Sequence, residues 1–291
     1  MRVGRHRAGL AVICDNRTVD RSDLARRRAA FRKLHESGCF VIPNPWDAGS
    51  ARALETLGFK ALATTSSGFA WSRAHPDNAM DVDAVLAHCR DIVEATGLPV
   101  NADFEDGHAR DLDSLKRNVR RCIDTGVAGL SIEDSTGDAS QPLYPFDEAV
   151  ARLRAAREAI DASGEDVLLV GRAECFLVGH LDPLDEAIRR LRAYAAAGAD
   201  CLYAPGVQST EHIEAVVQAV SPKPVNVLVG RRAPFTLADL ARLGVRRVSV
   251  GGALAGAAWG GFLRAARDLA EGRFDGFATN ATHTELDGLF G

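Results

Sequence analysis

Acidic side chains gather where two neighbouring apolar runs end, and there they could hold a metal ion. Asp103 and Glu105 follow one run, and Glu133 follows the next. If these runs are adjacent strands, the three carboxylates cannot all stay ionised without a counter-charge. A hard divalent cation with oxygen ligands would supply it, and magnesium or manganese fits. The plainer alternative, which we prefer for Asp134, is that the acids begin the following helices.

Two other polar groups could bind an anionic substrate. Residues 65–68 (Thr-Ser-Ser-Gly) follow an apolar run and offer consecutive backbone N–H groups and small hydroxyls, which suit a carboxylate or phosphate. The same composition is also typical of a turn. Arg172 ends another apolar run, where a guanidinium could clamp a substrate carboxylate. Alternatively, Arg172 forms a salt bridge with Glu174 or Glu133.

The elements that position these residues alternate regularly from about residue 39. The predicted strands cover residues 39–42, 61–65, 99–102, 129–132, 167–170, 201–203, 225–229 and 247–250. The predicted helices cover 48–57, 81–95, 111–125, 146–162, 184–197, 209–219, 236–243 and 254–271. Apolar strands without strict alternation indicate burial on both faces, as in a parallel sheet. About eight such units predict a closed α/β barrel of the (β/α)₈ (TIM) type.

The barrel is expected to form one catalytic domain over residues 38–272, between an N-terminal extension with a helix (1–37) and a C-terminal tail (273–291). The N-terminal helix would plug the bottom of the barrel or pack at its edge. Its arginines at 26–28 are predicted to form the solvent-exposed face. The polar, Gly-rich tail would wrap another subunit or be mobile.

Composition and charge limit the kinds of partner that the protein is expected to bind. The chain has 291 residues, is 46% hydrophobic and carries a formal net charge of -4, which argues against nucleic acid as a partner. Its six cysteines include no CxxC pair, so neither a zinc ribbon nor a disulfide framework is expected. No run is long enough to span a membrane or to serve as a secretory signal. We therefore expect a cytoplasmic protein that binds neither nucleic acid nor a membrane.

Four phrases, in this order, resemble the isocitrate lyase/phosphoenolpyruvate mutase superfamily: PNPWDAGSARALETLGFKALATTSSGFA, LPVNADFEDG, GVAGLSIEDSTG and GRAECFLVG. The likeness runs from about residue 40 to 265. It implies a (β/α)₈ barrel whose last helix is often swapped between subunits, assembled as a homodimer or homotetramer. It also implies bound Mg²⁺ (or Mn²⁺), a 2-oxo or 2-hydroxy acid substrate and a metal-stabilised enolate intermediate.

The resemblance assigns roles to individual positions. The residues that match the family's Ser-Gly-Gly stretch, and so would hold the substrate carboxylate, are Thr65, Ser66, Ser67 and Gly68. Asp77 matches the aspartate of the loop after the second strand. Asp103 matches the second acid of an Asp-Ala-Asp metal motif, and Glu133 matches a glutamate near the metal. Arg172 matches the substrate-binding arginine, and Asn226, on the seventh strand, is expected to contact the substrate as well.

Two positions depart from the family pattern. Asn101 stands where the first acid of the Asp-Ala-Asp motif is usually the direct metal ligand, and a neutral amide binds a hard cation more weakly. The expected ligand set is therefore Asp103, Glu133 and Asn101, with Glu105 as compensation. Segment 135–145 is short and lacks the Lys-Lys-Cys-Gly motif, which argues against isocitrate or methylisocitrate lyase activity.

These features predict a metal-dependent lyase, hydrolase or decarboxylase that cleaves a C–C bond of a small, oxaloacetate-like 2-oxo (or 2-hydroxy) acid. Arg172 would orient the substrate, and Asp77 or Glu105 would activate a water where the reaction needs one. Two alternatives remain open. The enzyme could perform P–C bond chemistry, as phosphoenolpyruvate mutase and phosphonopyruvate hydrolase do, or the barrel could bind a small acid without catalysis.

Overall fold

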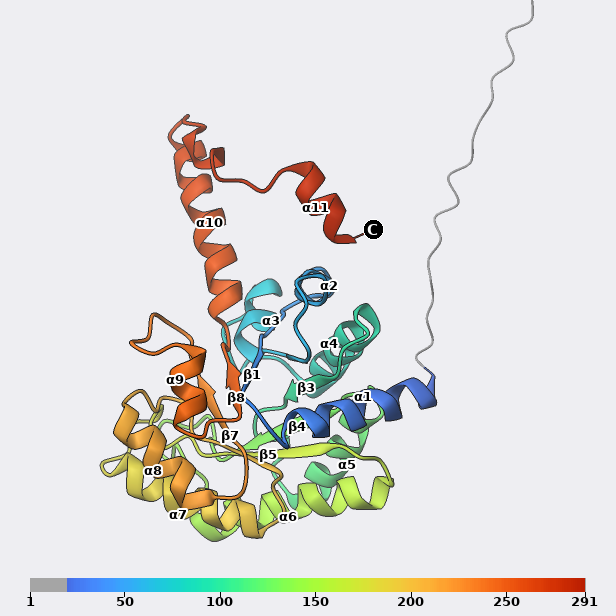
Figure 1. The fold of residues 1–291 in the computed structure, drawn as a ribbon, viewed down its shortest axis with the longest axis vertical. Coiled ribbons are helices and arrows are strands. Elements are labelled where there is room, and N and C mark those ends of the chain that lie inside the picture. Colours follow the sequence, from blue (N-terminus) through green and yellow to red (C-terminus); the bar gives the residue numbers. More distant parts are fainter. Residues whose placement is uncertain (1–19, 291) are drawn as a thin grey trace, which may run out of the picture.

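A computed structural model describes residues 20–290 as a parallel barrel surrounded by helices (Figure 1). The strands are β1 (Phe40–Ile42), β2 (Leu62–Ala63), β3 (Val100–Asp103), β4 (Gly129–Glu133), β5 (Leu168–Arg172), β6 (Cys201–Tyr203), β7 (Val225–Leu228) and β8 (Arg247–Ser249). The helices are α1 (Arg21–Leu34), α2 (Ala48–Thr56), α3 (Ser66–Ser72), α4 (Val82–Ala95), α5 (Leu112–Ile123), α6 (Phe146–Ser163), α7 (Pro183–Ala196), α8 (Thr210–Val220), α9 (Leu237–Arg242), α10 (Ala253–Ala270) and α11 (His283–Phe290), with a 3₁₀ turn η1 (Asp275–Phe277). The predicted fold class is confirmed, and the first 19 residues of the predicted N-terminal extension lie outside the described residues.

The sheet runs in the order β1-β8-β7-β6-β5-β4-β3-β2, and all pairs are parallel. Between β1 and β2 the barrel is joined just beyond β1, where the Ala63 N–H donates to the Pro43 carbonyl at 3.0 Å. The Asn44 amide then donates to the Thr64 carbonyl at 2.8 Å, and its oxygen accepts from the Val250 N–H at 2.9 Å. One buried asparagine therefore ties the first, second and last strands together at the rim.

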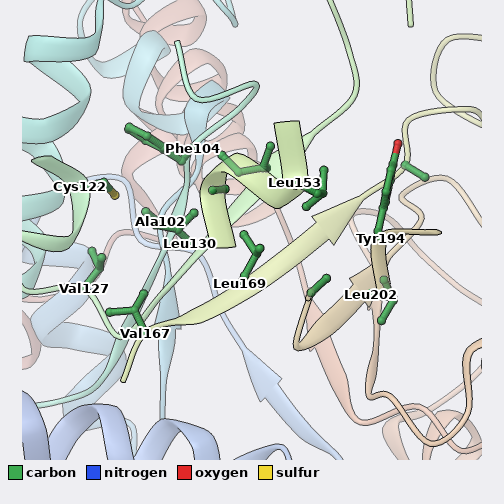
Figure 2. Close-up of a cluster of buried hydrophobic side chains, with 14 of the residues drawn as sticks. Ala102, Phe104, Cys122, Val127, Leu130, Leu153, Val167, Leu169, Tyr194 and Leu202 are labelled. Atoms are coloured by element: carbon green, nitrogen blue, oxygen red, sulfur yellow. The ribbon is translucent and has the colours of Figure 1, made fainter. Parts of the chain in front are cut away.

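Alternation along the central strands decides which side chains reach the interior. Leu130 of β4 and Leu169 of β5 pack outward into the large cluster between strands and helices, together with Leu153 of α6 (Figure 2). Because successive side chains point to opposite faces of a strand, Glu133 and Arg172, which are paired in register, point into the barrel instead. The apolar core thus fixes the orientation of both charged residues.

Helix α1 covers the bottom of the barrel, as one of the two sequence alternatives predicted. Phe31 is fully buried and packs inside the lower barrel against Ile42, Ala61 and Leu168. A side chain at Gly129 would collide with this ring, because its Cβ would lie 2.8 Å from Phe31 Cε1. The bottom of the barrel is therefore a closed apolar plug.

The prediction of a solvent-exposed face at arginines 26–28 is wrong for two of the three. Arg27 is buried and donates to the Thr96 carbonyl at 2.6 Å, just after α4. Arg28 is also buried and donates to the Ile123 carbonyl at 3.2 Å, at the end of α5. The last carbonyls of a helix have no partner within it and carry partial negative charge, so these guanidinium groups stabilise two helix ends.

The C-terminal segment leaves the barrel. Helix α10 extends away from it, and the chain returns as α11 beside α2 (Figure 1), where the Thr56 hydroxyl donates to the Leu289 carbonyl at 3.3 Å. Ala255 is the buried residue of α10, whereas Trp259 and Phe262 are exposed. The tail predicted from residue 273 contains η1 and α11. Within residues 20–290 no helix has the length and apolarity needed to cross a membrane, and the five cysteines there are free thiols.

Candidate active site

A polar cavity of about 160 Å³ opens among the carboxyl ends of the strands. It collects the following predicted site residues: Thr65, Ser66, Ser67, Asp77, Asn101, Asp103, Arg172 and Asn226. Three further predicted residues, Gly68, Glu105 and Glu133, are not among those that line it. The strand ends of a (β/α)₈ barrel are where its catalytic residues normally lie, so this cavity is the candidate active site.

Arg172 is the hub of the carboxylate cluster. Its Nη1 lies 3.0 Å from Asp103 Oδ1 and 3.0 Å from Glu133 Oε2, and its Nε donates to Glu174 Oε1. Burial alone would lower the pKa of Arg172, but Glu133, Glu174 and Asp103 raise it well above its ordinary value. The ion-pair alternative from the sequence therefore holds in this structure, and the guanidinium charge is already neutralised by protein carboxylates.

The cluster nevertheless holds more negative charge than one guanidinium can balance. Burial, followed by the charges of Asp103 and Asp77, raises the pKa of Glu105 to about 8. Burial also raises the pKa of Glu133 well above its ordinary range, against the opposing effect of Arg172. Without a further cation these acids therefore retain protons near neutral pH.

This excess of negative charge is the observation against which the predicted metal site can be tested. A set of carboxylate oxygens in need of positive charge suits a hard divalent cation such as Mg²⁺. Among residues 20–290, however, no three or more His, Cys, Asp or Glu side chains are arranged as a ready ligand group. The donor chemistry fits the cation, while Arg172 now pairs with Asp103 and Glu133, two of the carboxylates that the cation would use.

Glu105 sits in a tight, strained turn after β3. Its φ is +47° and that of His108 is +49°, both in the left-handed region that disfavours side chains. The turn is pinned from two sides, because the Glu133 N–H donates to the Glu105 carbonyl at 3.0 Å and Asn118 donates to the Gly107 carbonyl at 3.0 Å. Glu105 is thus held close to Asp103 and Asp77, although it does not line the cavity.

The predicted anion-binding stretch, residues 65–68, forms the N-cap and first turn of helix α3. The sequence predicted no helix at this position. Thr65 is the N-cap, and its hydroxyl accepts from the Gly68 N–H at 3.3 Å. The Ser66 N–H donates to Asp103 Oδ2 at 3.0 Å. Two of the predicted backbone donors therefore bind protein groups. Gly68 serves close packing, since a Cβ there would lie 2.7 Å from Thr65 Cγ2.

Asp134 anchors the wall behind the site. It is buried and accepts hydrogen bonds from Arg190 Nη1 at 3.0 Å, from the Tyr194 hydroxyl at 2.5 Å and from the Glu174 N–H at 2.8 Å. The prediction that Asp134 begins a helix is wrong, because α6 starts much later, after Pro145. Its carboxylate instead fixes the backbone of the glutamate that pairs with Arg172.

A second arginine in the cavity was not predicted from the sequence. Arg247 is only 3% exposed, and its Nε donates to Asn226 Oδ1 at 2.8 Å. Its Nη1 lies 3.4 Å from Asn101 Oδ1, and the Asn226 amide in turn donates to the Ser249 hydroxyl at 2.9 Å. The signal was a basic residue at the start of an apolar strand. Catalytic residues of such barrels are expected after the strands, whereas Arg247 is the first residue of β8 and lies lower in the barrel.

Comparison with known proteins shows to which family the chain belongs. The sequence profile of phosphoenolpyruvate phosphomutase matches residues 31–270. The chain belongs to this family. The resemblance inferred from the four sequence phrases is thereby confirmed.

Relatives of this mutase-family barrel span nearly its whole length. A lyase/mutase homologue from Burkholderia cenocepacia J2315 has a solved structure that is 47% identical, with a TM-score of 0.89 over 92% of this chain and 97% of that one. The oxaloacetate decarboxylase of Chromohalobacter salexigens is 32% identical and covers 89% of this chain and 92% of its own. Oxaloacetate acetylhydrolase, solved with its product oxalate, is 27% identical, with a TM-score of 0.80 over 92% and 93% of the two chains.

Proposed function

We propose that this protein is a carbon–carbon lyase that cleaves a small 2-oxo dicarboxylic acid of the oxaloacetate type. The observation that carries the proposal is the cavity itself. Its wall contains the half-buried guanidinium of Arg172 and the carboxylate of Asp103, and Arg172 also pairs with Glu133, which does not line the cavity; the excess negative charge of these carboxylates favours a bound cation. The named activities of the full-length relatives support the same chemistry.

Asp103, Glu105 and Glu133 would hold a Mg²⁺ or Mn²⁺ ion, with Asn101 beside them as the neutral member of the set. When bound, such an ion polarises a 2-oxo group and stabilises the negative charge that develops as the bond breaks. Because its pKa is raised, Glu105 would have to lose a proton in order to serve as a ligand.

The chain's own side chains would bind and orient the acid. The hydroxyls of Ser66 and Ser67 and the Asn226 amide line the cavity and can donate hydrogen bonds to a carboxylate. Arg172 fixes the positions of Asp103 and Glu133, and from the cavity wall it would orient the substrate. Where the reaction needs an activated water, Asp77 at the cavity wall is the candidate base, because burial and the charge of Asp103 raise its pKa.

The test is a panel of substrates with matched variants. Purified protein is incubated with 2-oxo and 2-hydroxy diacids and with phosphonopyruvate, with Mg²⁺ or with EDTA, and release of pyruvate, glyoxylate or phosphate is followed. We expect Mg²⁺-dependent C–C cleavage that is lost in Asp103→Asn and kept in Asp91→Asn, an exposed control on α4. Phosphate release would identify P–C chemistry instead, and tight binding without turnover would identify a non-catalytic acid-binding barrel.

The exposed α10 supports assembly through a second copy of the chain. Trp259 is 37% and Phe262 is 60% exposed on a helix that extends from the barrel, an unusual surface for an isolated monomer. We propose that this helix packs on the barrel of a neighbouring subunit in a homodimer or homotetramer. Light scattering coupled to gel filtration tests this directly, and a monomer at micromolar concentration would contradict it.

A further inference from the structure

Arg247 is a buried cation without a buried anion. Its guanidinium lies inside the barrel, and its hydrogen-bond partners are the neutral amides of Asn226 and Asn101. In the part of the chain that the structure describes, no Asp or Glu lies within 4.0 Å of it, whereas Arg172 and Arg190 are both paired with carboxylates. Burying a charge without a partner is strongly unfavourable, so such a group points to an anion that arrives from outside.

The two arginines of the cavity differ in this respect. Arg172 faces Asp103, Glu133 and Glu174, which neutralise it. Arg247 lines the same cavity from β8, and its positive charge is not neutralised by any of these acids. Of the two, Arg247 is the one whose charge is available to a ligand in the structure as it stands.

The neutral side chain of Asn101 helps to leave Arg247 without an anionic partner. Its Oδ1 lies 3.4 Å from Arg247 Nη1, so a carboxylate at this position would pair with the guanidinium and cancel its charge. Gly129 leaves room for the amide, because a Cβ there would lie 2.7 Å from Asn101 Oδ1. The neutral residue that weakens the metal site is thus the one that keeps the cation of Arg247 free.

We propose that Arg247 binds an anionic end of the substrate that enters the barrel interior, and that it selects acids with two negative groups over acids with one. Asn226 would position the guanidinium through its 2.8 Å hydrogen bond to Nε. The inference rests on the proposed function in placing the acid in this cavity, but it concerns recognition and not bond cleavage.

The test compares malonate with malonamate, which has the same shape with one carboxylate replaced by an amide. Affinities are measured by calorimetry in EDTA for the wild type, Arg247→Met, Arg247→Lys and the control Arg246→Gln, which alters the neighbouring arginine that bonds to the Gly38 carbonyl outside the cavity. We expect the wild type and Arg246→Gln to prefer malonate by about tenfold or more, the range of a hydrogen bond to a charged group. Arg247→Met should lose this preference, and Arg247→Lys should keep part of it.

Asn101→Asp gives an independent arm if Arg247→Met does not fold. We expect it to weaken malonate binding in EDTA by about tenfold, because the new carboxylate pairs with Arg247. Unchanged or tighter malonate binding in this variant would overturn the proposal, and so would a wild type that does not prefer malonate or an Arg247→Met variant that still does.

The substrate panel separates this inference from the proposed function. If Arg247 governs the malonate preference but no diacid is turned over, recognition by Arg247 stands and the lyase proposal fails. If oxaloacetate is cleaved and Arg247→Met keeps the preference, the lyase proposal stands and the inference fails.

Discussion

Glu105 offers the sharpest test of the electrostatics of the site. Its pKa lies at about 8 in the folded protein against an ordinary value of 4.5, first because it is buried and then because Asp103 and Asp77 are close. Between these two pH values the unfolded chain has released the proton while the folded protein still holds it. The free energy of unfolding therefore falls as pH rises through this window and levels off above about pH 8.

Replacing Glu105 by Gln removes this titration with little change in shape. A pKa displacement from 4.5 to about 8 corresponds to about 5 kcal/mol, at about 1.4 kcal/mol per pH unit. In EDTA we expect Glu105→Gln to have nearly wild-type stability at pH 4.5 and to be more stable by about 2 to 5 kcal/mol at pH 8.

Urea unfolding of both proteins across this pH range measures the difference. Glu214→Gln, the same chemical change at an exposed position of α8, serves as the control and should show no such pH dependence. A stability difference that is the same at every pH, or a variant that is less stable at pH 8, would refute the reasoning. Added Mg²⁺ should stabilise the wild type more than Glu105→Gln, because the amide is a poorer ligand.

Three further predictions concern other parts of the molecule. Arg172→Met should lower kcat/KM for the best acid of the panel by at least about 30-fold, since it leaves buried carboxylates without their partner, and near-normal kinetics would contradict this. Asp134→Asn should lower the free energy of unfolding by about 1 to 3 kcal/mol, because Arg190 then keeps Glu186 but loses the buried carboxylate of Asp134, and an unchanged stability in urea would argue against that role. Phe262→Asp on α10 should shift the protein toward monomer in light scattering, and an unchanged mass would show that this face is not the subunit contact.

The barrel could be predicted from the sequence because its strands carry a strong local signal. The predicted strand at 129–132, for example, differs from β4 (Gly129–Glu133) by one residue. Glu133 and Arg172 were placed at the strand ends by the same pattern, and the register confirms that they face each other. Local apolar periodicity thus decides which residues reach the rim.

What the sequence did not reveal depends on long-range contacts. Residues 65–68 have the composition of a turn, yet Thr65 caps a helix there because Gly68 lets α3 pack closely against Trp46. The charged sequence around Arg27 and Arg28 is typical of a solvent-exposed helix face. Their hydrogen-bond partners, however, are backbone carbonyls more than sixty residues away in the sequence. Arg247 was not predicted because its neutral hydrogen-bond partners lie on two other strands.

The most direct measurement is the rate of pyruvate release from oxaloacetate as a function of Mg²⁺ concentration, corrected for the metal-catalysed reaction without enzyme. The account predicts a saturable, Mg²⁺-dependent rate for the wild type and for Asp91→Asn, and a much weaker response for Asp103→Asn. Equal turnover in EDTA and in Mg²⁺, or an unchanged metal response in Asp103→Asn, would contradict the claim that these carboxylates recruit the cation on which cleavage depends.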